Sequence, residues 1–421
     1  MPKSVPVKQQ LSRETSGTES LVHIQQSKEI LNKRFSHLGK YTPVQQQDQE
    51  NSDTEEDMPA VTSIAREFLN TKYECLRPTP LISPYNQELI MLLQLLEKQR
   101  ELNMEDKNAL SYRHAIAAIK AYPRKLQSVR EAEKIIGIGK KMTTLIRAYL
   151  ATGHVLEAEQ LLMDERFQTL RLFNKAFGVG PSTAKLWWDM GYRTLQEVLD
   201  NAQLTTSVRL AIELLPDLIQ PMTRDDVKEL VDIIQREVIA TDKEAFVTPV
   251  GGYRRGKEEN GDLDVLISSK SSTVGLLSLL VQSLIKKGYI RHKLWYSDAN
   301  AKVTGHKLHN KKFGSGVHRR IMDGLDKCFA AFLQPSKGVL RQVDIIVVAP
   351  EEYATAILGW TGSRQFERSI RDYASKEKNM TVNSQSIHIN TVPRQQLTVE
   401  TEEQAFEIIG VPWLEPEMRN C

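Results

Sequence analysis

The sequence predicts an α+β protein in which helical domains precede a domain built on a mixed β-sheet. Apolar residues recur at helical spacing from Tyr85 to about Val238, whereas short runs of β-branched residues begin at Phe246. Two Gly-x-Gly turns stand between helical segments of the first part. At 421 residues the chain is long enough for roughly two to four domains.

Residues 1–71 differ in composition from the rest of the chain. They include a Gln-rich piece, YTPVQQQDQ, and an acidic run, ENSDTEED, with few large apolar side chains to offset the entropy lost on ordering. We expect a disordered tail or linker here.

Residues 72–154 are expected to form a first helical domain, because three segments each carry an apolar stripe: NQELIMLLQLLEKQREL, DKNALSYRHAIAAIKAYPRKL and TTLIRAYLATG. A glycine closes the last of these. Residues 155–243 are expected to form a second helical subdomain. Its segment TRDDVKELVDIIQREV opens with Thr before two acids, which is a capping signal.

Residues 244–351 are expected to hold the sheet, with strands in FVTPVGGY, DLDVLISS and RQVDIIVVAP and a helix in STVGLLSLLVQSLIKKG. Residues 352–421 form a last subdomain, in which SRQFERSIRDYASKEKN is helical. From residue 297 to about 321 the chain is polar and without clear period. A loop of this length indicates either function or disorder.

The composition bears on the class of protein. Charges nearly cancel, with 56 Lys and Arg against 53 Asp and Glu, so any binding of nucleic acid must come from local patches. The three cysteines lie far apart and suit a reducing compartment rather than a disulfide framework or a zinc site. We find neither the apolar core of a signal peptide nor a run long enough to span a membrane, and expect a soluble intracellular protein.

The two glycine turns, IIGIGKKM and AFGVGPST, have the form that is typical of a helix-hairpin-helix. Such a turn offers backbone N–H groups at a helix start to a DNA phosphate, without regard to base sequence. One Gly-x-Gly between helices is more often an ordinary connection, but two in one chain favour DNA binding. The residues concerned are Gly137, Gly139, Lys140 and Lys141 in the first turn and Gly178 and Gly180 in the second.

Three acids are candidates for a metal site. Asp262 and Asp264 open an apolar strand, and alternate strand residues face the same side, so their carboxylates project together. Asp344 interrupts the apolar run VDIIVV, where a buried carboxylate without a compensating cation would be costly. Convergent carboxylates suit Mg²⁺ or Mn²⁺, and two such ions would serve phosphoryl transfer.

The segment GGYRRGK, residues 251–257, stands directly upstream of these acids. Gly251 and Gly252 permit close approach of backbone N–H groups to a phosphate, and Arg254, Arg255 and Lys257 supply positive charge to a triphosphate. A lone Asp-x-Asp is usually only the solvated face of a strand. Its combination with the basic glycine segment and a third acid in an apolar strand instead favours a catalytic site.

These motifs resemble family X of the DNA polymerases, which includes polymerases beta, lambda and mu and terminal deoxynucleotidyl transferase. The resemblance runs from about Lys72 to Cys421. It is closest to polymerase mu, the transferase and the fungal polymerase IV type in five stretches: KYECLRPTPL, RFQTLRLFNKAFGVGPSTAKLWWDMGYRTL, GGYRRGK, GWTGSRQFERSIRDYA and EPEMRN. It implies a helical domain that binds a downstream 5′-phosphate, followed by a polymerase beta-like hand with a palm at 244–351 and a subdomain for the nascent base pair at 352–421.

The resemblance also implies roles for single residues. Asp262, Asp264 and Asp344 would be catalytic and hold the metal ions. The nucleotide would meet Gly251, Gly252, Arg255, Lys257, Gly359, Trp360 and Gly362. DNA would meet Tyr112, Arg113, Gly137, Gly139, Lys140, Lys141, Gly178, Gly180, Arg368 and Arg371. Of these, Tyr112, Arg113, Lys140 and Lys141 would hold the downstream 5′-phosphate. The main-chain carbonyls of Asn174, Ala176 and Val179 would hold a monovalent cation.

The chain departs from the family pattern at several places. Leu145 stands where lyase-competent relatives have a Schiff-base lysine, so lyase activity is not expected. Gly261 replaces a His that precedes the first acid in polymerase mu and the transferase, and Gln342 replaces an Arg near Asp344. The segment from 297 to 321 resembles the loop with which these two relatives stabilise poorly paired or absent template. Residues 1–71 have no room for a complete BRCT domain.

We therefore expect a monomeric nuclear enzyme that adds deoxynucleotides, and with weak sugar exclusion ribonucleotides, to a primer 3′-hydroxyl at gapped, nicked or broken DNA in gap filling or end joining. Gly359 leaves room for a 2′-hydroxyl, and some terminal transferase activity is compatible with the motifs. Partnership with Ku and DNA ligase IV does not follow without a BRCT domain. Two alternatives stay open: a DNA-end-binding scaffold with a decayed centre, and a nucleotidyltransferase acting on RNA or small molecules.

Overall fold

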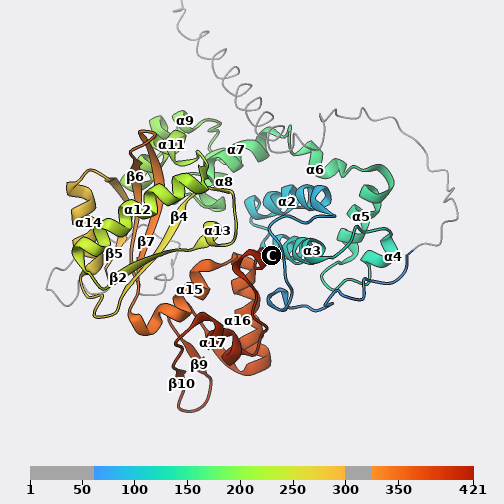
Figure 1. Cartoon of the computed structure of the whole chain (residues 1–421). Helices are drawn as coiled ribbons and strands as arrows, with labels where there is room; N and C mark the ends of the chain where they lie inside the picture. Colours follow the sequence, from blue (N-terminus) through green and yellow to red (C-terminus); the bar gives the residue numbers. More distant parts are fainter. Residues whose placement is uncertain (1–60, 299–324) are drawn as a thin grey trace, which may run out of the picture.

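The structure, a computed structural model, describes residues 61–298 and 325–421. Most of the predicted tail and most of the predicted loop after residue 297 lie outside the described residues. Within the described part, the α+β class is confirmed, with helices first and a five-stranded mixed sheet second (Figure 1). No helix in residues 61–298 or 325–421 combines the length and the apolar character that a membrane crossing needs.

The amino-terminal half is helical and has one continuous apolar core, which reaches from Ala65 to Ile212. Phe68 is 7% exposed in this core, so residues 61–71 belong to the helical domain and not to the predicted tail. Helix α5 is capped by the glycine that the sequence predicts, Gly153, whose φ of 74° is left-handed. The helices are α2 (Gln87–Leu102), α3 (Asp106–Ala121), α4 (Val129–Ala132), α5 (Lys140–Thr152), α6 (Leu156–Gln160), α7 (Glu165–Phe173), α8 (Pro181–Asp189), α9 (Leu195–Asn201), α10 (Thr206–Glu213) and α11 (Leu215–Leu218).

The sheet has the strand order β2-β4-β7-β6-β5, in which β4 and β7 are parallel and the other pairs antiparallel. A short ribbon of β1 and β3 lies beside it. The strands are β1 (Met222–Thr223), β2 (Ala245–Pro249), β3 (Glu259–Asn260), β4 (Leu263–Ser269), β5 (Ile290–Ser297), β6 (Asp326–Gln334) and β7 (Val339–Val347).

Helices α12 (Arg224–Thr241) and α14 (Leu276–Lys286) cover one face of the sheet. Helix α12 begins with the predicted cap, a capping box in which Thr223 and Asp226 bond each other's backbone N–H. The predicted border at residues 243–244 separates α12 from the sheet, although the two share one apolar core.

Two local expectations were wrong. The strand expected through FVTPVGGY ends at Pro249, and the glycine pair opens a helical turn, α13 (Gly251–Arg254). Strands β5 and β6 were not predicted. Strand β6 is interior and buried on both faces except at Leu333, so its sequence, DKCFAAFLQ, lacks the alternation that marks a half-buried strand.

The carboxyl-terminal subdomain packs around α16 and returns to the amino-terminal side of the molecule (Figure 1). Its core includes Tyr73 and Cys75 from the 3-10 helix η3 (Glu74–Leu76) and its preceding residue, and Thr79 pairs with Arg419 in a parallel bridge. Residues 72–80 therefore join the helical domain to this subdomain. The elements are η5 (Pro350–Glu352), α15 (Tyr353–Thr361), α16 (Arg364–Lys378), β8 (Met380–Val382), β9 (Ile387–Ile389), β10 (Gln395–Leu397), α17 (Glu402–Ile409) and η6 (Pro416–Met418).

Candidate active site

The three acids meet at the parallel pair of strands. The register of β4 and β7 sets Asp264 beside Asp344, and Asp262 precedes β4 by one residue. One carboxylate oxygen from each lies within 4.8 Å of the others. Leu263 and Val265 point to the opposite face, into the core under α12 and α14.

The acids repel one another, and they differ in exposure: Asp262 is exposed, Asp264 is half-buried and Asp344 is buried. Burial, joined by the charge of Asp262, raises the pKa of Asp264 to about 7. The pKa of Asp344, which is 8% exposed, is raised well above its ordinary value by burial and by both other acids. Three converging carboxylate oxygens are a donor set for a hard divalent cation, whose charge would reverse the pKa shifts of Asp264 and Asp344.

Asp344 receives a hydrogen bond from a neutral side chain. Gln342 Nε2 donates to Asp344 Oδ1 at 3.1 Å, because the two residues are two apart on β7 and face the same side. The amide stands where the family pattern has an arginine. It therefore orients the carboxylate without adding a positive charge.

The glycine pair fits closely against the acids. Gly251 has φ of +59°, and a Cβ there would lie 2.0 Å from Asp264 Oδ2. A Cβ on Gly252 would lie 2.9 Å from Lys257 Cδ. Only glycine therefore lets this backbone approach Asp264 so closely.

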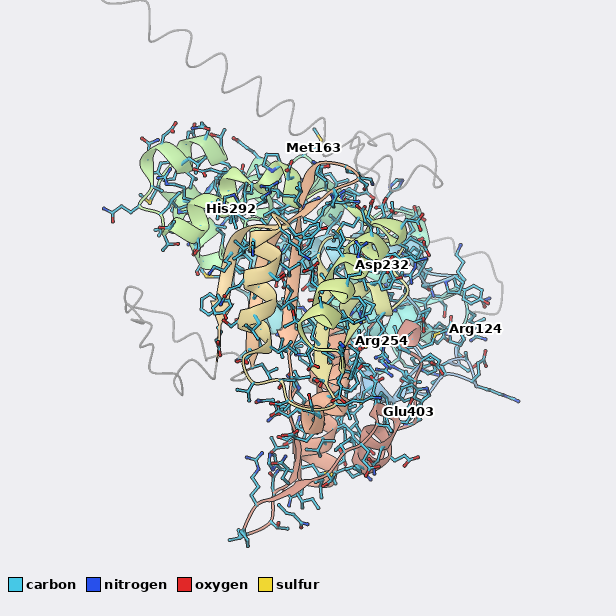
Figure 2. All side chains as sticks on the ribbon, turned by 60° about the vertical axis from the view of Figure 1, so that its left-hand side comes forward. Arg124, Met163, Asp232, Arg254, His292 and Glu403 are labelled. Atoms are coloured by element: carbon cyan, nitrogen blue, oxygen red, sulfur yellow. The ribbon has the colours of Figure 1, made fainter. Side chains whose placement is uncertain are left out.

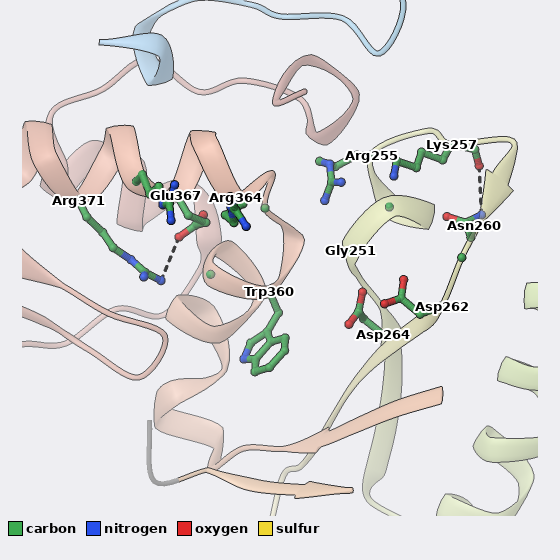
Figure 3. Close-up of a pocket in the computed structure, with 15 residues that line it drawn as sticks. Gly251, Arg255, Lys257, Asn260, Asp262, Asp264, Trp360, Arg364, Glu367 and Arg371 are labelled. Atoms are coloured by element: carbon green, nitrogen blue, oxygen red, sulfur yellow. Dashed lines mark hydrogen bonds and ion pairs between the residues drawn. The ribbon is translucent and has the colours of Figure 1, made fainter. Parts of the chain in front are cut away.

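A cavity of about 400 Å³ opens beside the acids, between the sheet and helices α15 and α16. Figure 3 shows Asp262 and Asp264 on one side and Glu367 and Arg371 on the other, with Trp360 between them. Every residue predicted for the nucleotide lines this cavity, together with the two arginines of α16. These residues are Gly251, Gly252, Arg255, Lys257, Gly359, Trp360, Gly362, Arg368 and Arg371.

Four further residues line the cavity that were not predicted for the site: Asn260, Gly261, Arg364 and Glu367. The signal for two of them was present. Arg364 and Glu367 recur with Arg368 and Arg371 at helical spacing, so one face of α16 carries all four.

Glu367 is an unusual member of this face because it is buried beside positive charge. Burial raises its pKa to about 7, although Arg371 lies 3.3 Å from Glu367 Oε2 and opposes the shift. Glu367 Oε1 and Arg371 Nε are buried without a hydrogen-bond partner among the described residues. The pair therefore leaves polar atoms available to a ligand.

Gly359 and Trp360 are both tightly packed. A Cβ on Gly359 would lie 3.2 Å from Ser384 Cβ, so a larger side chain there would push against the chain before β9. Lys327 Nζ lies 5.0 Å from the centroid of the Trp360 ring, a cation–π distance. The indole Nε1 has no partner among the described residues.

The two neighbouring arginines of segment 251–257 face different surroundings. Arg255 lines the cavity, and its guanidinium donates to the Thr361 carbonyl. Arg254, which we expected to supply charge to a triphosphate, instead forms an ion pair at 2.7 Å with Glu402 of α17. Figure 2 places it between the sheet domain and the carboxyl-terminal subdomain.

A second cavity, of about 820 Å³, lies in the helical domain at the first glycine turn. It brings together most of the residues predicted for the 5′-phosphate, namely Tyr112, Gly137, Gly139, Lys140 and Lys141.

Arg113 is the exception among the residues predicted for this phosphate. It does not line the second cavity, and pairs instead with Glu97 at 2.6 Å and Glu101 at 3.4 Å on α2. Helical spacing turns it away from its neighbour Tyr112. Leu145, at the lyase position, is 6% exposed in the helical core and offers no amine.

The second glycine turn begins α8. Gly178 has φ of +82° and Gly180 caps the helix. Of the three carbonyls predicted for a cation, that of Val179 accepts from Asn174 Nδ2 at 2.8 Å and that of Ala176 from the Val179 N–H at 3.0 Å. Each keeps a second lone pair for a further ligand.

Family models match most of the described chain. They are a helix-hairpin-helix domain at residues 84–155, the fingers domain of DNA polymerase lambda at 171–219, the DNA polymerase beta palm at 221–327 and the DNA polymerase beta thumb at 356–420.

Curated relatives agree with these models. Human DNA nucleotidylexotransferase is 30% identical over 402 residues, which cover 91% of this chain and 76% of that protein. DNA polymerase type-X family protein pol4 of Schizosaccharomyces pombe is 30% identical over 389 residues, 89% of this chain and 71% of that protein. Human DNA-directed DNA/RNA polymerase mu is 28% identical over 366 residues, 83% of this chain and 72% of that protein.

The alternative of a decayed scaffold is not favoured, because the acids converge, a cavity lies beside them and the relatives are polymerases and nucleotidyltransferases. The expected resemblance is confirmed: the chain belongs to family X of the DNA polymerases, a family of metal-dependent nucleotidyltransferases.

Proposed function

We propose that the protein is a DNA-repair polymerase that adds nucleotides to a primer 3′-hydroxyl at short gaps or broken DNA ends. One observation carries the proposal. The parallel pairing of β4 and β7 brings Asp264 beside Asp344, with Asp262 at the mouth of a cavity that glycines and cations line.

In this proposal Asp262, Asp264 and Asp344 hold two Mg²⁺ or Mn²⁺ ions. When bound, the ions stabilise the attacking and leaving oxygens of phosphoryl transfer. Asp344 orients the primer 3′-hydroxyl or takes its proton, and the hydrogen bond from Gln342 fixes the direction of its carboxylate.

The triphosphate lies along segment 251–257. Gly251 and Gly252 let backbone N–H groups approach its oxygens, and Arg255 and Lys257 neutralise its charge. A bound triphosphate would also reduce the repulsion between these two cations. The segment thus places the α-phosphate next to the three acids.

The sugar and base of the nucleotide lie against Gly359, Trp360 and Gly362, while Arg368 and Arg371 face the template or the nascent pair. Because position 359 has no side chain, we propose weak exclusion of a 2′-hydroxyl, so that ribonucleotides are also used. The name of the human relative, a DNA/RNA polymerase, supports this part.

The second cavity receives the 5′-phosphate of a downstream strand, with Lys140 and Lys141 as its cations and Tyr112 as a hydrogen-bond donor. The turn at Gly178 and Gly180 holds the primer backbone. A monovalent cation at the carbonyls of Asn174, Ala176 and Val179 would assist it. Because Leu145 has no amine, we propose that the protein lacks lyase activity at this place.

In the cell we propose a nuclear enzyme that acts as a monomer. The names of its relatives, a nucleotidylexotransferase and two polymerases, support a nucleotidyl-transfer reaction. Ku and DNA ligase IV are candidate partners in end joining, although residues 1–71 are not expected to hold a complete BRCT domain that would recruit them. Some terminal transferase activity belongs to the same proposal.

The decisive experiment is primer extension on gapped, nicked, open and blunt DNA, with deoxy- and ribonucleotides in parallel and Mg²⁺ or Mn²⁺. Asp264→Ala should abolish extension while DNA binding persists. Asp232→Ala, which removes an exposed acid on α12, is the matched control and should extend normally. Extension by Asp264→Ala would refute the site, and binding without turnover by the unaltered protein would favour the scaffold.

A further inference from the structure

The segment 416–421 lies where the helical domain, the sheet domain and the carboxyl-terminal subdomain meet (Figure 1). Its backbone pairs with Thr79: the Asn420 N–H donates to the Thr79 carbonyl at 3.0 Å, and the Thr79 N–H donates to the Met418 carbonyl at 2.7 Å. Ser363, at the start of α16, donates its hydroxyl to the Cys421 carbonyl at 2.9 Å. The segment is thus fixed from two sides.

Asn420 is 5% exposed, and its side-chain amide bonds to Arg255 at both ends and to the Glu417 carbonyl at 2.8 Å. Asn420 Oδ1 accepts from Arg255 Nε at 3.1 Å, and Asn420 Nδ2 donates to the Arg255 carbonyl at 3.2 Å. At the other side of the guanidinium, Nη1 donates to the Thr361 carbonyl. Two of the three guanidinium nitrogens are therefore held, and no hydrogen bond joins Nη2 to any described residue, which leaves it to a ligand.

Lys120 reaches the same place from the helical domain. It stands in the last turn of α3, is 9% exposed, and its Nζ donates to the Asn420 carbonyl at 2.8 Å. Burial lowers its pKa to about 8, and the charges of Lys257 and Arg255 add to this effect while Cys421 opposes it. Three cations thus gather around segment 251–257, although only Arg255 and Lys257 line the cavity.

A buried lysine without an acidic partner costs free energy, and Lys120 Nζ donates to a main-chain carbonyl rather than to a carboxylate. A bound polyanion would compensate the positive charge of Lys120, Arg255 and Lys257. The cavity beside these residues is the one proposed for a triphosphate. The same anion would favour the charged form of Lys120.

The geometry points to Asn420 as a positioning residue for Arg255 in the triphosphate site, and to Lys120 as the residue that links this contact to the helical domain. The inference rests on the proposed function, in which Arg255 binds the triphosphate. It has a specific consequence. Affinity for the incoming nucleotide depends on the docking of a domain that contributes no residue to the lining of the cavity.

The test measures single-nucleotide extension on gapped DNA with the full chain. Asn420→Ala should raise KM for the nucleotide about tenfold and change kcat less than about threefold, because hydrogen bonds to a charged group contribute on this order. Lys120→Met should raise KM about threefold. Asn201→Ala and Lys125→Met replace exposed residues of the same types and should leave KM unchanged.

Double variants separate positioning from general structure. In an Arg255→Ala background, Asn420→Ala should change KM less than about twofold, because the group it positions is gone. Additive effects, or an unchanged KM in a folded Asn420→Ala protein, would overturn the inference. Thermal unfolding will show whether Asn420→Ala is destabilised. If it is, the KM of Lys120→Met decides the question instead, because this variant leaves every side chain of segment 416–421 in place. An Arg255→Ala protein with normal KM would instead refute the proposed triphosphate site.

Discussion

The substitution Gly251→Ala probes the closest contact of the site. The added Cβ would lie 2.0 Å from Asp264 Oδ2, where ordinary contact begins at 3.4 Å, so the carboxylate must move by about 1.4 Å or α13 must shift. The partner is a carboxylate already confined by Asp344 and by burial. A displacement of this size in a catalytic group costs about 100-fold in rate.

The backbone adds a second, smaller effect. At φ of +59° an alanine costs on the order of 1–2 kcal/mol relative to glycine. Gly338→Ala is the matched control, because Gly338 has φ of +65° in the turn between β6 and β7 and a Cβ there meets nothing within 4 Å. It carries the backbone cost without the clash.

The assay is single-turnover primer extension, with DNA binding by fluorescence anisotropy and thermal unfolding on the same preparations. Gly251→Ala should extend at least about 100-fold more slowly than the unaltered protein while it binds DNA with similar affinity. Gly338→Ala should lower the unfolding midpoint by a similar amount and keep its rate. A folded Gly251→Ala protein that extends within threefold of normal would refute the reasoning.

Three further changes have definite expected results. Asp344→Asn should abolish extension and raise the free energy of unfolding at pH 8, because burial and repulsion already disfavour the carboxylate. Burial raises the pKa of Glu367 to about 7 from an ordinary 4.5, so the free energy of unfolding should fall as pH rises through this window. Glu367→Gln should therefore raise the free energy of unfolding by up to about 3 kcal/mol at pH 8 and leave it unchanged at pH 4, as measured by denaturant unfolding. Lys141→Ala should weaken binding of 5′-phosphorylated gapped DNA and reduce the slope of log K against log salt by about 1.

Each of these has an outcome that contradicts it. A less stable Asp344→Asn protein would mean that the acids do not repel one another in the folded state. Equal stability gains at pH 4 and pH 8 would assign the effect of Glu367→Gln to packing rather than to charge. For Lys141→Ala, an equal loss with 5′-hydroxyl DNA would place the lysine on another phosphate.

Much of the site could be inferred from local pattern. Alternation along a strand sets Asp262 and Asp264 on one face. A glycine has no side chain, so its backbone can approach a neighbouring group closely, as at Gly251. Helical spacing along α16 could have yielded Glu367 as well, since it shares a face with Arg371. Strand β6 is also buried on both faces and has no alternation, but unlike β4 and β7 its sequence, DKCFAAFLQ, contains no β-branched residue that would mark it as a strand.

What the sequence by itself determined is the chemistry that each segment carries: paired acids, a basic glycine segment and two glycine turns between helices. What only the tertiary structure decided is which segments meet. Three contacts join separate elements of the chain. The parallel register sets Asp264 beside Asp344, Arg113 pairs with Glu97 on α2, and Lys120 contacts Asn420. The physical reason is that the periodicity of side chains along a helix or strand depends only on neighbouring residues. The pairing of two strands or helices depends on how their complete surfaces pack against each other.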